Sequence, residues 1–242
     1  MTLSNSAPST PTAEPTSKAL LTASQLNKTV QIGEQRLSII KDVSIHVDAG
    51  EFVVIMGKSG SGKSTLLGLL AALDYPDSGT VKLGENTLSD LDEDALAAIR
   101  QSDMGFVFQS FHLLPTLTVA ENIAFPLDIA RRSDTARVDE LIASVDLSHR
   151  RDSLPNQLSG GEQQRTAVAR ALVSQPKIVF ADEPTGNLDE HNADQVMRLL
   201  LDLRQQTGSA LVVVTHDPAL AEMADRVITM HDGVIDGSAT NE

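Results

Sequence analysis

The stretch that most constrains this chain is Gly57-Lys58-Ser59-Gly60-Ser61-Gly62-Lys63-Ser64, which matches the phosphate-binding pattern G-x-x-x-x-G-K-[ST]. Residues 51–56 before it form an apolar run suited to a buried strand, and residues 64–73 after it carry apolar side chains at helical spacing. A strand, a glycine loop and a helix in this order surround a phosphate with backbone N–H groups at the positive end of the helix. A glycine turn that matches by accident is the alternative, and the flanking strand and helix argue against it.

The loop predicts specific contacts with a nucleoside triphosphate. The Lys63 ammonium would reach the β- and γ-phosphates, and the Ser64 hydroxyl would be a ligand of Mg²⁺. Lys58 either adds charge near the phosphates or points to solvent, and we favour solvent. We predict that the nucleotide is bound by Gly57, Lys58, Ser59, Gly60, Ser61, Gly62, Lys63, Ser64 and Thr65.

Composition narrows the classes of partner. The chain has 242 residues, of which 41% are hydrophobic, enough for the core of one large α/β domain. Its 19 basic and 33 acidic residues give a net charge of −14, which argues against binding to nucleic-acid backbones or anionic lipid. No apolar run approaches the length of a membrane span and no signal peptide is evident, so we expect a cytoplasmic chain without direct lipid insertion.

The order of patterns along the chain predicts its architecture. Residues 1–18 are mostly Ser, Thr, Pro and Ala, which predicts a disordered tail ahead of one domain at 19–242. We expect an α/β fold, with a P-loop NTPase core built on a mostly parallel sheet. An N-terminal antiparallel β-subdomain and a helical insert at about 110–165 complete it. We expect strands at 20–23, 36–40, 43–47, 80–83, 105–108, 177–182 and 210–215, a hairpin at 226–235, and helices at 92–100, 119–124, 134–144, 166–173 and 192–205.

Two acidic residues follow a buried strand. Asp182 ends the apolar run 178–182, where a second phosphate-loop element places an Asp to hold Mg²⁺ or its waters. Glu183 comes next, where its carboxylate would face the γ-phosphate and polarise the attacking water. An ordinary strand-to-turn Asp-Glu pair is the alternative, and it would be preferred if the phosphate loop were missing.

The stretch Leu158-Ser159-Gly160-Gly161-Glu162 offers a second Gly-Gly turn that opens a helix, and therefore a second anion site. A plain helix N-cap is the alternative. With this pentapeptide upstream of the Asp-Glu strand, the sequence resembles the ATP-binding cassette (ABC) ATPases, whose signature motif it matches. The resemblance implies a homodimer in which two subunits pair head to tail. Each signature, here Ser159, Gly160, Gly161 and Glu162, would close over the γ-phosphate held by the other subunit.

The resemblance extends over about residues 20–235. Gln109 matches the Q-loop glutamine, Asn187-Leu188-Asp189 matches the D-loop, and His216 matches the switch histidine that contacts the γ-phosphate. It implies ATP and Mg²⁺ as cofactors. The implied catalytic residues are Lys63, Glu183 and His216; the implied metal ligands are Ser64, Gln109 and Asp182; the implied further nucleotide contacts are Gln109, Asp189 and the signature residues.

Finer likenesses suggest a subgroup and a partner. Gly186-Asn187-Leu188-Asp189 departs from the commoner Ser-Ala-Leu-Asp and, with segments 105–109, 113–115 and 121–123, resembles the bacterial LolD, MacB and YbbA group. Segment 110–115 is most similar to YbbA-type chains. The resemblance implies an ATPase that powers a separate inner-membrane permease for lipoprotein release or efflux, at the inner face of that membrane. The sequence names neither the transported molecule nor the permease, and it does not give the direction of transport, because the transport site lies in the partner.

Two alternative functions fit the sequence less well. A soluble ABC ATPase acting on nucleic acid or the ribosome is disfavoured by the charge and by the lack of coiled coils or zinc inserts, and a phosphate-loop kinase leaves 158–162 unexplained.

Where the family has an aromatic residue that stacks on adenine, this chain has Val30, so the sequence does not say how adenine is held. The family's permease groove implies docking near Gln109–Pro115, where Phe111, Leu113 and Leu114 are apolar.

Overall fold

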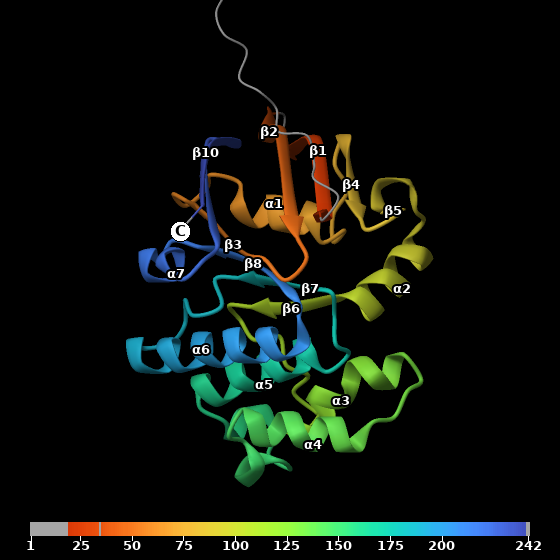
Figure 1. The fold of residues 1–242 in the computed structure, drawn as a ribbon, viewed down its shortest axis with the longest axis vertical. Coiled ribbons are helices and arrows are strands. Elements are labelled where there is room, and N and C mark those ends of the chain that lie inside the picture. The colour runs from red at the N-terminus through yellow and green to blue at the C-terminus, as the bar shows by residue number, and fades with distance from the viewer. Residues whose placement is uncertain (1–18, 34, 241–242) are drawn as a thin grey trace, which may run out of the picture.

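Two sheets form the framework of the structure, a computed structural model that describes residues 19–33 and 35–240. The predicted tail at 1–18 lies outside the described residues. One sheet has four strands in the order β2-β1-β4-β5, and the other has six in the order β10-β9-β3-β8-β7-β6. In Figure 1 the two sheets are stacked above a layer of helices. The strands of the first sheet are β1 (Ala19–Ile32), β2 (Gln35–Asp48), β4 (Ser78–Leu83) and β5 (Asn86–Thr87).

The six-stranded sheet is mostly parallel, as the sequence predicts. Strands β3, β6, β7, β8 and β9 run parallel, and β10 pairs antiparallel with β9. All six residues of β8 are buried, because this strand lies inside the sheet and is covered on both faces. The bounds are β3 (Phe52–Gly57), β6 (Met104–Phe108), β7 (Ile178–Asp182), β8 (Ala210–Thr215), β9 (Arg226–His231) and β10 (Val234–Thr240).

Helices cover the sheets in two groups. Helix α1 (Lys63–Leu70) lies between the two sheets, where its leucines join one core (Figure 1). A second core holds α5 and α6 against the other face of the six-stranded sheet, and α3 and α4 pack beyond α5. No helix within the described ranges has both the length and the apolar content of a membrane span. The remaining bounds are α2 (Glu93–Asp103), α3 (Val119–Ile129), α4 (Thr135–Ser144), α5 (Gly160–Leu172), α6 (Glu190–Thr207) and α7 (Pro218–Glu222), with 3-10 turns η1 (Leu88–Asp90), η2 (Ser148–Arg150) and η3 (Pro155–Gln157).

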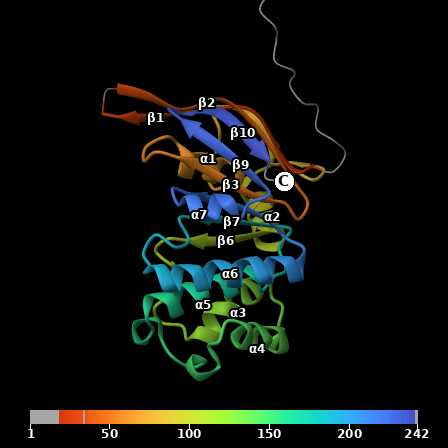
Figure 2. The same ribbon diagram turned by 60° about the vertical axis from the view of Figure 1, so that its left-hand side comes forward.

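Several predicted boundaries are wrong, and three of them concern the elements nearest the N-terminal sheet and the glycine pair. The strands expected at 36–40 and 43–47 form one strand, β2, because register shifts along the β1–β2 pair absorb the irregular residue Asp42, whose φ is 53°. Strand β1 continues to Ile32, so the two strands form a hairpin whose tip projects from the body (Figure 2). Helix α5 begins at Gly160 rather than at 166. Its first two residues are glycines, which have low helix propensity, but the capping box formed by Ser159 and Glu162 starts the helix there all the same.

The buried aromatic side chain of Phe180 offers a test of this packing. Phe180 is 1% exposed, and its ring is stacked against Phe106 with 6.0 Å between centroids. We expect Phe180→Ala to lower the free energy of unfolding by about 3–5 kcal/mol, because it removes buried contacts and leaves a cavity. Urea unfolding followed by circular dichroism measures this change. The control Met223→Ala, at a side chain 46% exposed, should stay within about 0.5 kcal/mol. Equal effects would contradict the packing.

Candidate functional site

The phosphate loop leaves the start of α1 without a side-chain cap. Gly62 is the N-cap residue of α1, has a φ of 100° and provides no side-chain acceptor. Every other α-helix within the described ranges has its first turn capped by an Asp, Thr or Ser side chain. A Cβ at Gly62 would lie 2.9 Å from the Ile39 carbonyl oxygen, so both the left-handed φ and the close approach require glycine. The N–H groups of this turn therefore remain available to an anionic ligand.

A cavity of about 670 Å³ opens over this turn. It gathers side chains from the carboxyl ends of neighbouring parallel strands, where α/β proteins bind ligands. Nine of the predicted residues line it, and Ile39 of β2 joins them, although nothing in the sequence indicated Ile39. The lining residues are Ile39, Ser59, Gly60, Gly62, Lys63, Ser64, Thr65, Gln109, Glu183 and His216.

Three predicted loop residues support the cavity without lining it. Gly57 closely approaches the Met230 carbonyl, Ser61 is 4% exposed, and Lys58 is exposed, in keeping with the solvent interpretation. The N–H of Gly233, in the turn between β9 and β10, donates to the carbonyl of Ser61 at 3.0 Å. The β9–β10 hairpin thus supports the phosphate loop through this hydrogen bond.

Lys63 is held within the loop. It is 8% exposed, and its Nζ donates to the carbonyl oxygens of Gly57 at 2.8 Å and Lys58 at 3.2 Å. An ammonium group has three protons, so one donor remains for a phosphate oxygen. The two loop carbonyls fix the position of the charge.

Ser64 and Asp182 meet beside the loop. The Ser64 hydroxyl donates to the Asp182 carboxylate at 3.0 Å, and burial raises the pKa of Asp182 although this hydrogen bond opposes the shift. Hydroxyl and carboxylate oxygens suit Mg²⁺, which keeps several waters and takes phosphate oxygens as further ligands. The described residues contain no cluster of three or more His, Cys, Asp or Glu fit for a metal, and Mg²⁺ bound with a nucleotide needs none. The residues present therefore fit a magnesium ion.

Glu183 occupies a strained position at the end of β7. Its φ is 45°, in the left-handed region, and its backbone N–H donates to the Val214 carbonyl at 2.9 Å. The carboxylate accepts a hydrogen bond from Thr215 at 3.2 Å, and its two oxygens lie 3.0 and 3.1 Å from Nδ1 of His216. Two residues of the next strand end thus fix the Glu183 side chain in the cavity.

The signature stretch forms a helix N-cap. The Ser159 hydroxyl accepts from the Glu162 N–H at 3.3 Å, and the Glu162 carboxylate accepts from the Ser159 N–H at 2.7 Å. Within the described residues, 159–162 do not line the cavity of their own subunit. The structure thus has the N-cap that the sequence left as an alternative, and a phosphate contact by these residues stays a prediction.

Two other predicted positions also lie outside the cavity lining. Asp189 caps α6 by accepting from the Asn192 N–H at 3.0 Å, a bond that lowers the pKa of Asp189. Val30 pairs with Leu37 in the β1–β2 hairpin, and the apolar side of the described cavity comes from Ile39 instead. A nucleotide contact by Asp189 therefore stays a prediction.

An arginine holds the segment after Gln109. Phe111 and His112 both have left-handed backbones, with φ of 59° and 48°. The guanidinium of Arg170, on α5, donates to the carbonyl oxygens of His112 at 2.6 Å and Phe111 at 2.8 Å, and burial lowers the pKa of Arg170. Because charge-assisted hydrogen bonds are about twice as strong as neutral ones, they offset the strain of this turn. No pattern in the sequence indicates this role of Arg170.

Comparison with known proteins gives this site a family. The family model described as "ABC transporter" matches residues 40–186. The chain belongs to the ABC transporter family. The predicted family, that of the ABC ATPase cassettes, and the α/β P-loop fold class are thereby confirmed. No comparison favours the nucleic-acid alternative.

Curated ABC relatives include two of the three names expected from the sequence, LolD and MacB. The lipoprotein-releasing system ATP-binding protein LolD of Idiomarina loihiensis is 44% identical over 220 residues, which cover 90% of this chain and 96% of LolD. The macrolide export ATP-binding/permease protein MacB of Salmonella paratyphi A is 46% identical over 220 residues, covering 90% of this chain and 34% of MacB. The chain therefore spans about a third of the length of such MacB relatives. The likeness to YbbA-type chains stays a prediction.

Solved ABC cassettes share the fold. Two dimeric structures of the cassette MJ0796, one of them in a post-hydrolysis state bound to ADP and Pi, match with a TM-score of 0.84 and 40% identity. Each match covers 91% of this chain and 98% of the other.

The Glu162 carboxylate predicts a pH-dependent contribution to stability. Burial alone would raise its pKa, but hydrogen bonds from the Ser159 backbone, Arg150 and the Ser159 hydroxyl outweigh burial and lower the pKa from 4.5 to about 2. A depressed folded-state pKa stabilises the fold above the unfolded pKa, and this contribution is lost as the pH falls from about 4.5 to about 2. The stability advantage of the wild type over Glu162→Gln should therefore shrink across that range.

Urea unfolding at several pH values measures this difference. The matched substitution Glu85→Gln lies at an exposed turn and lacks these partners. A difference between wild type and Glu162→Gln that stays constant with pH would contradict the prediction.

Proposed function

We propose that this chain binds Mg²⁺-ATP in the cavity over α1 and hydrolyses it with the residues that line that cavity. The observation that carries the proposal is the uncapped first turn of α1, whose free N–H groups and adjacent Lys63 ammonium offer donors to the β- and γ-phosphates. Ser64 and Asp182 supply oxygen ligands beside these donors. The phosphates would thus meet N–H donors, an ammonium group and a cation at one place.

Each catalytic side chain has a stated task. Lys63 binds phosphate oxygens, and Glu183 accepts a hydrogen bond from the attacking water and draws its proton toward the carboxylate. His216 holds Glu183 in place and, as a cavity residue, faces the γ-phosphate. Ser64, Asp182 and Gln109 would hold a magnesium ion, which would neutralise part of the charge on the phosphates.

In this proposal, two copies of the chain form the active dimer. Residues 159–162 begin α5 and lie outside the cavity of their own subunit, so a second copy is needed to bring a signature to the γ-phosphate. The solved cassettes that match this chain are described as dimeric. Head-to-tail pairing follows, because each copy has one phosphate loop and one signature to contribute.

The transport partner is a separate permease in this proposal. The LolD relative, which this chain matches along nearly its full length, is named the ATP-binding protein of a lipoprotein-releasing system. The MacB relatives are named ATP-binding/permease proteins and are about three times longer than the matched part. We propose that this chain acts like LolD, at the inner face of the inner membrane, with its permease in another chain.

The permease would dock in a groove between α2 and α3. The residues predicted to dock, Phe111, Leu113 and Leu114, are half-buried, and an adjoining groove of about 340 Å³ reaches His112. This α2–α3 groove is lined largely by Leu73, Met104, Phe106, Phe108, Phe125 and Pro126. Leu73 of this groove is 51% exposed, and Ile129, in an adjoining pocket that shares Leu73 and Phe125 with it, is 58% exposed. Contiguous exposed apolar side chains of this kind mark interaction surfaces. A short helix on the cytoplasmic side of the permease, with one apolar face, is the proposed occupant.

Hydrolysis is tested with Glu183→Gln. Because the amide is a poor proton acceptor, we expect ATPase turnover to fall about 10²–10⁴-fold while ATP binding persists. An ATP-bound dimer should accumulate, which size-exclusion chromatography with light scattering detects. Lys63→Ala is the companion variant and should lose ATP affinity in calorimetry. Turnover at the wild-type rate in Glu183→Gln would remove Glu183 from the reaction.

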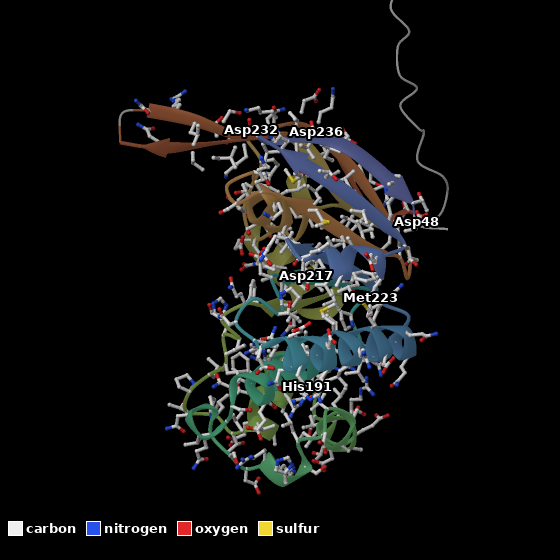
Figure 3. All side chains as sticks on the ribbon, turned by 90° about the vertical axis from the view of Figure 1, so that its left-hand side faces the viewer. Asp48, His191, Asp217, Met223, Asp232 and Asp236 are labelled. Atoms are coloured by element: carbon white, nitrogen blue, oxygen red, sulfur yellow. The ribbon has the colours of Figure 1, made fainter. Side chains whose placement is uncertain are left out.

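Docking is tested with Ile129→Asp. The exposed position spares the fold, and a charge placed in an apolar contact should abolish co-purification of the permease while the basal ATPase rate of the isolated chain is kept. Leu113→Asp should act the same way if the predicted segment takes part. The control is Met223→Asp: Met223 is 46% exposed on the face that Figure 3 shows, whereas α2 is on the opposite side in Figure 1. Full yield of the complex with Ile129→Asp would locate docking elsewhere.

A further inference from the structure

Gln109 and Asn187 are joined by two hydrogen bonds. Nε2 of Gln109 donates to Oδ1 of Asn187 at 3.2 Å, and Nδ2 of Asn187 donates to the backbone carbonyl of Gln109 at 2.9 Å. The two residues are 78 positions apart and follow the neighbouring strands β6 and β7. Asn187 belongs to the stretch that departs from the commoner Ser-Ala-Leu-Asp, and no role has yet been assigned to it.

The backbone carbonyl fixes the orientation of both amides in turn. A carbonyl oxygen only accepts, so the Asn187 side chain must present its NH₂ group to Gln109 O. Oδ1 of Asn187 then faces the Gln109 side chain and can only accept, so Gln109 must present Nε2. The Gln109 amide oxygen is therefore the end left free, on a side chain that lines the cavity together with Ser64.

Gly186 makes room for this pair. A Cβ at Gly186 would lie 2.7 Å from Nε2 and 3.1 Å from Cδ of Gln109. The Gly186 N–H also donates to the Glu183 carbonyl at 3.1 Å, which ties the turn to the end of β7. The glycine and the asparagine thus receive the Gln109 side chain on a turn that begins at Glu183.

Exposure argues against a role in stability. Gln109, Gly186 and Asn187 are all exposed, and hydrogen bonds between exposed side chains add little to the free energy of folding because water competes for both partners. What the contacts restrict is which end of the Gln109 amide faces the cavity. Only the oxygen end is a ligand for a hard cation.

We propose that Asn187, with Gly186, is a positioning residue that presents the Gln109 amide oxygen to the cation beside Ser64 and Asp182. The proposal rests on the Mg²⁺-ATP site proposed above. It assigns to the Gly186-Asn187 pair a task that an Ala at the second position, without a polar side chain, would not perform.

Asn187→Ala tests the proposal through metal binding. The Mg²⁺ concentration for half-maximal ATPase activity should rise about tenfold, as for the loss of a group that orients a metal ligand, and kcat should recover at saturating Mg²⁺. ATP affinity measured in EDTA and the melting temperature should match the wild type. Mn²⁺ affinity, measured by electron paramagnetic resonance on the ADP-bound protein, should fall in parallel and needs no turnover. Asn86→Ala, at an exposed position in β5, is the matched control.

The outcomes separate this inference from the function on which it rests. Equal Mg²⁺ and Mn²⁺ dependence in Asn187→Ala and wild type would overturn the positioning role. A loss of ATP affinity in EDTA together with a lower melting temperature would overturn it too, because the pair would then be structural. A wild-type ATPase that needs no divalent cation would instead overturn the Mg²⁺-ATP site itself.

Discussion

The free N–H groups at the start of α1 are the constraint on which the rest of this structure depends. A helix N-terminus with no side-chain acceptor, placed between two sheets, requires a ligand or water to satisfy it. The surrounding structure holds this turn from several sides. The Ile39 carbonyl packs against Gly62, the β9–β10 turn hydrogen-bonds Ser61, and two loop carbonyls hold Lys63. The loop is thus preorganised for a phosphate by contacts with strands distant in sequence.

Much of the site follows from sequence, because chemistry fixes residue types at short spacings. The phosphate loop, the Asp182-Glu183 pair and His216 each stand at a strand end, and parallel strands bring such ends together. The mostly parallel sheet was predictable for the same reason, since buried strands read as continuous apolar runs. Where a residue type and a strand end coincide, the sequence is sufficient.

The remainder depends on contacts that leave no local pattern. Ile39 reaches the cavity only because β2 passes over the loop, and the break expected before Val43 is a bulge whose cost is absorbed by pairing with β1. The role of Arg170 depends on backbone carbonyls, which every residue type provides. Asn187 was visible as a departure from a common motif, but its partner, 78 residues away, appears only once the strands are paired.

The Arg170 contacts have a mechanical consequence. Arg170 belongs to α5, and its two hydrogen bonds end on the carbonyls of a left-handed turn three residues beyond Gln109 at most. The same turn borders the α2–α3 groove at His112. Because the guanidinium group is planar and donates to two backbone carbonyls at once, it holds α5 and this turn rigidly together. Displacement of the turn at the groove is therefore coupled directly to the last turn of α5 through one guanidinium group.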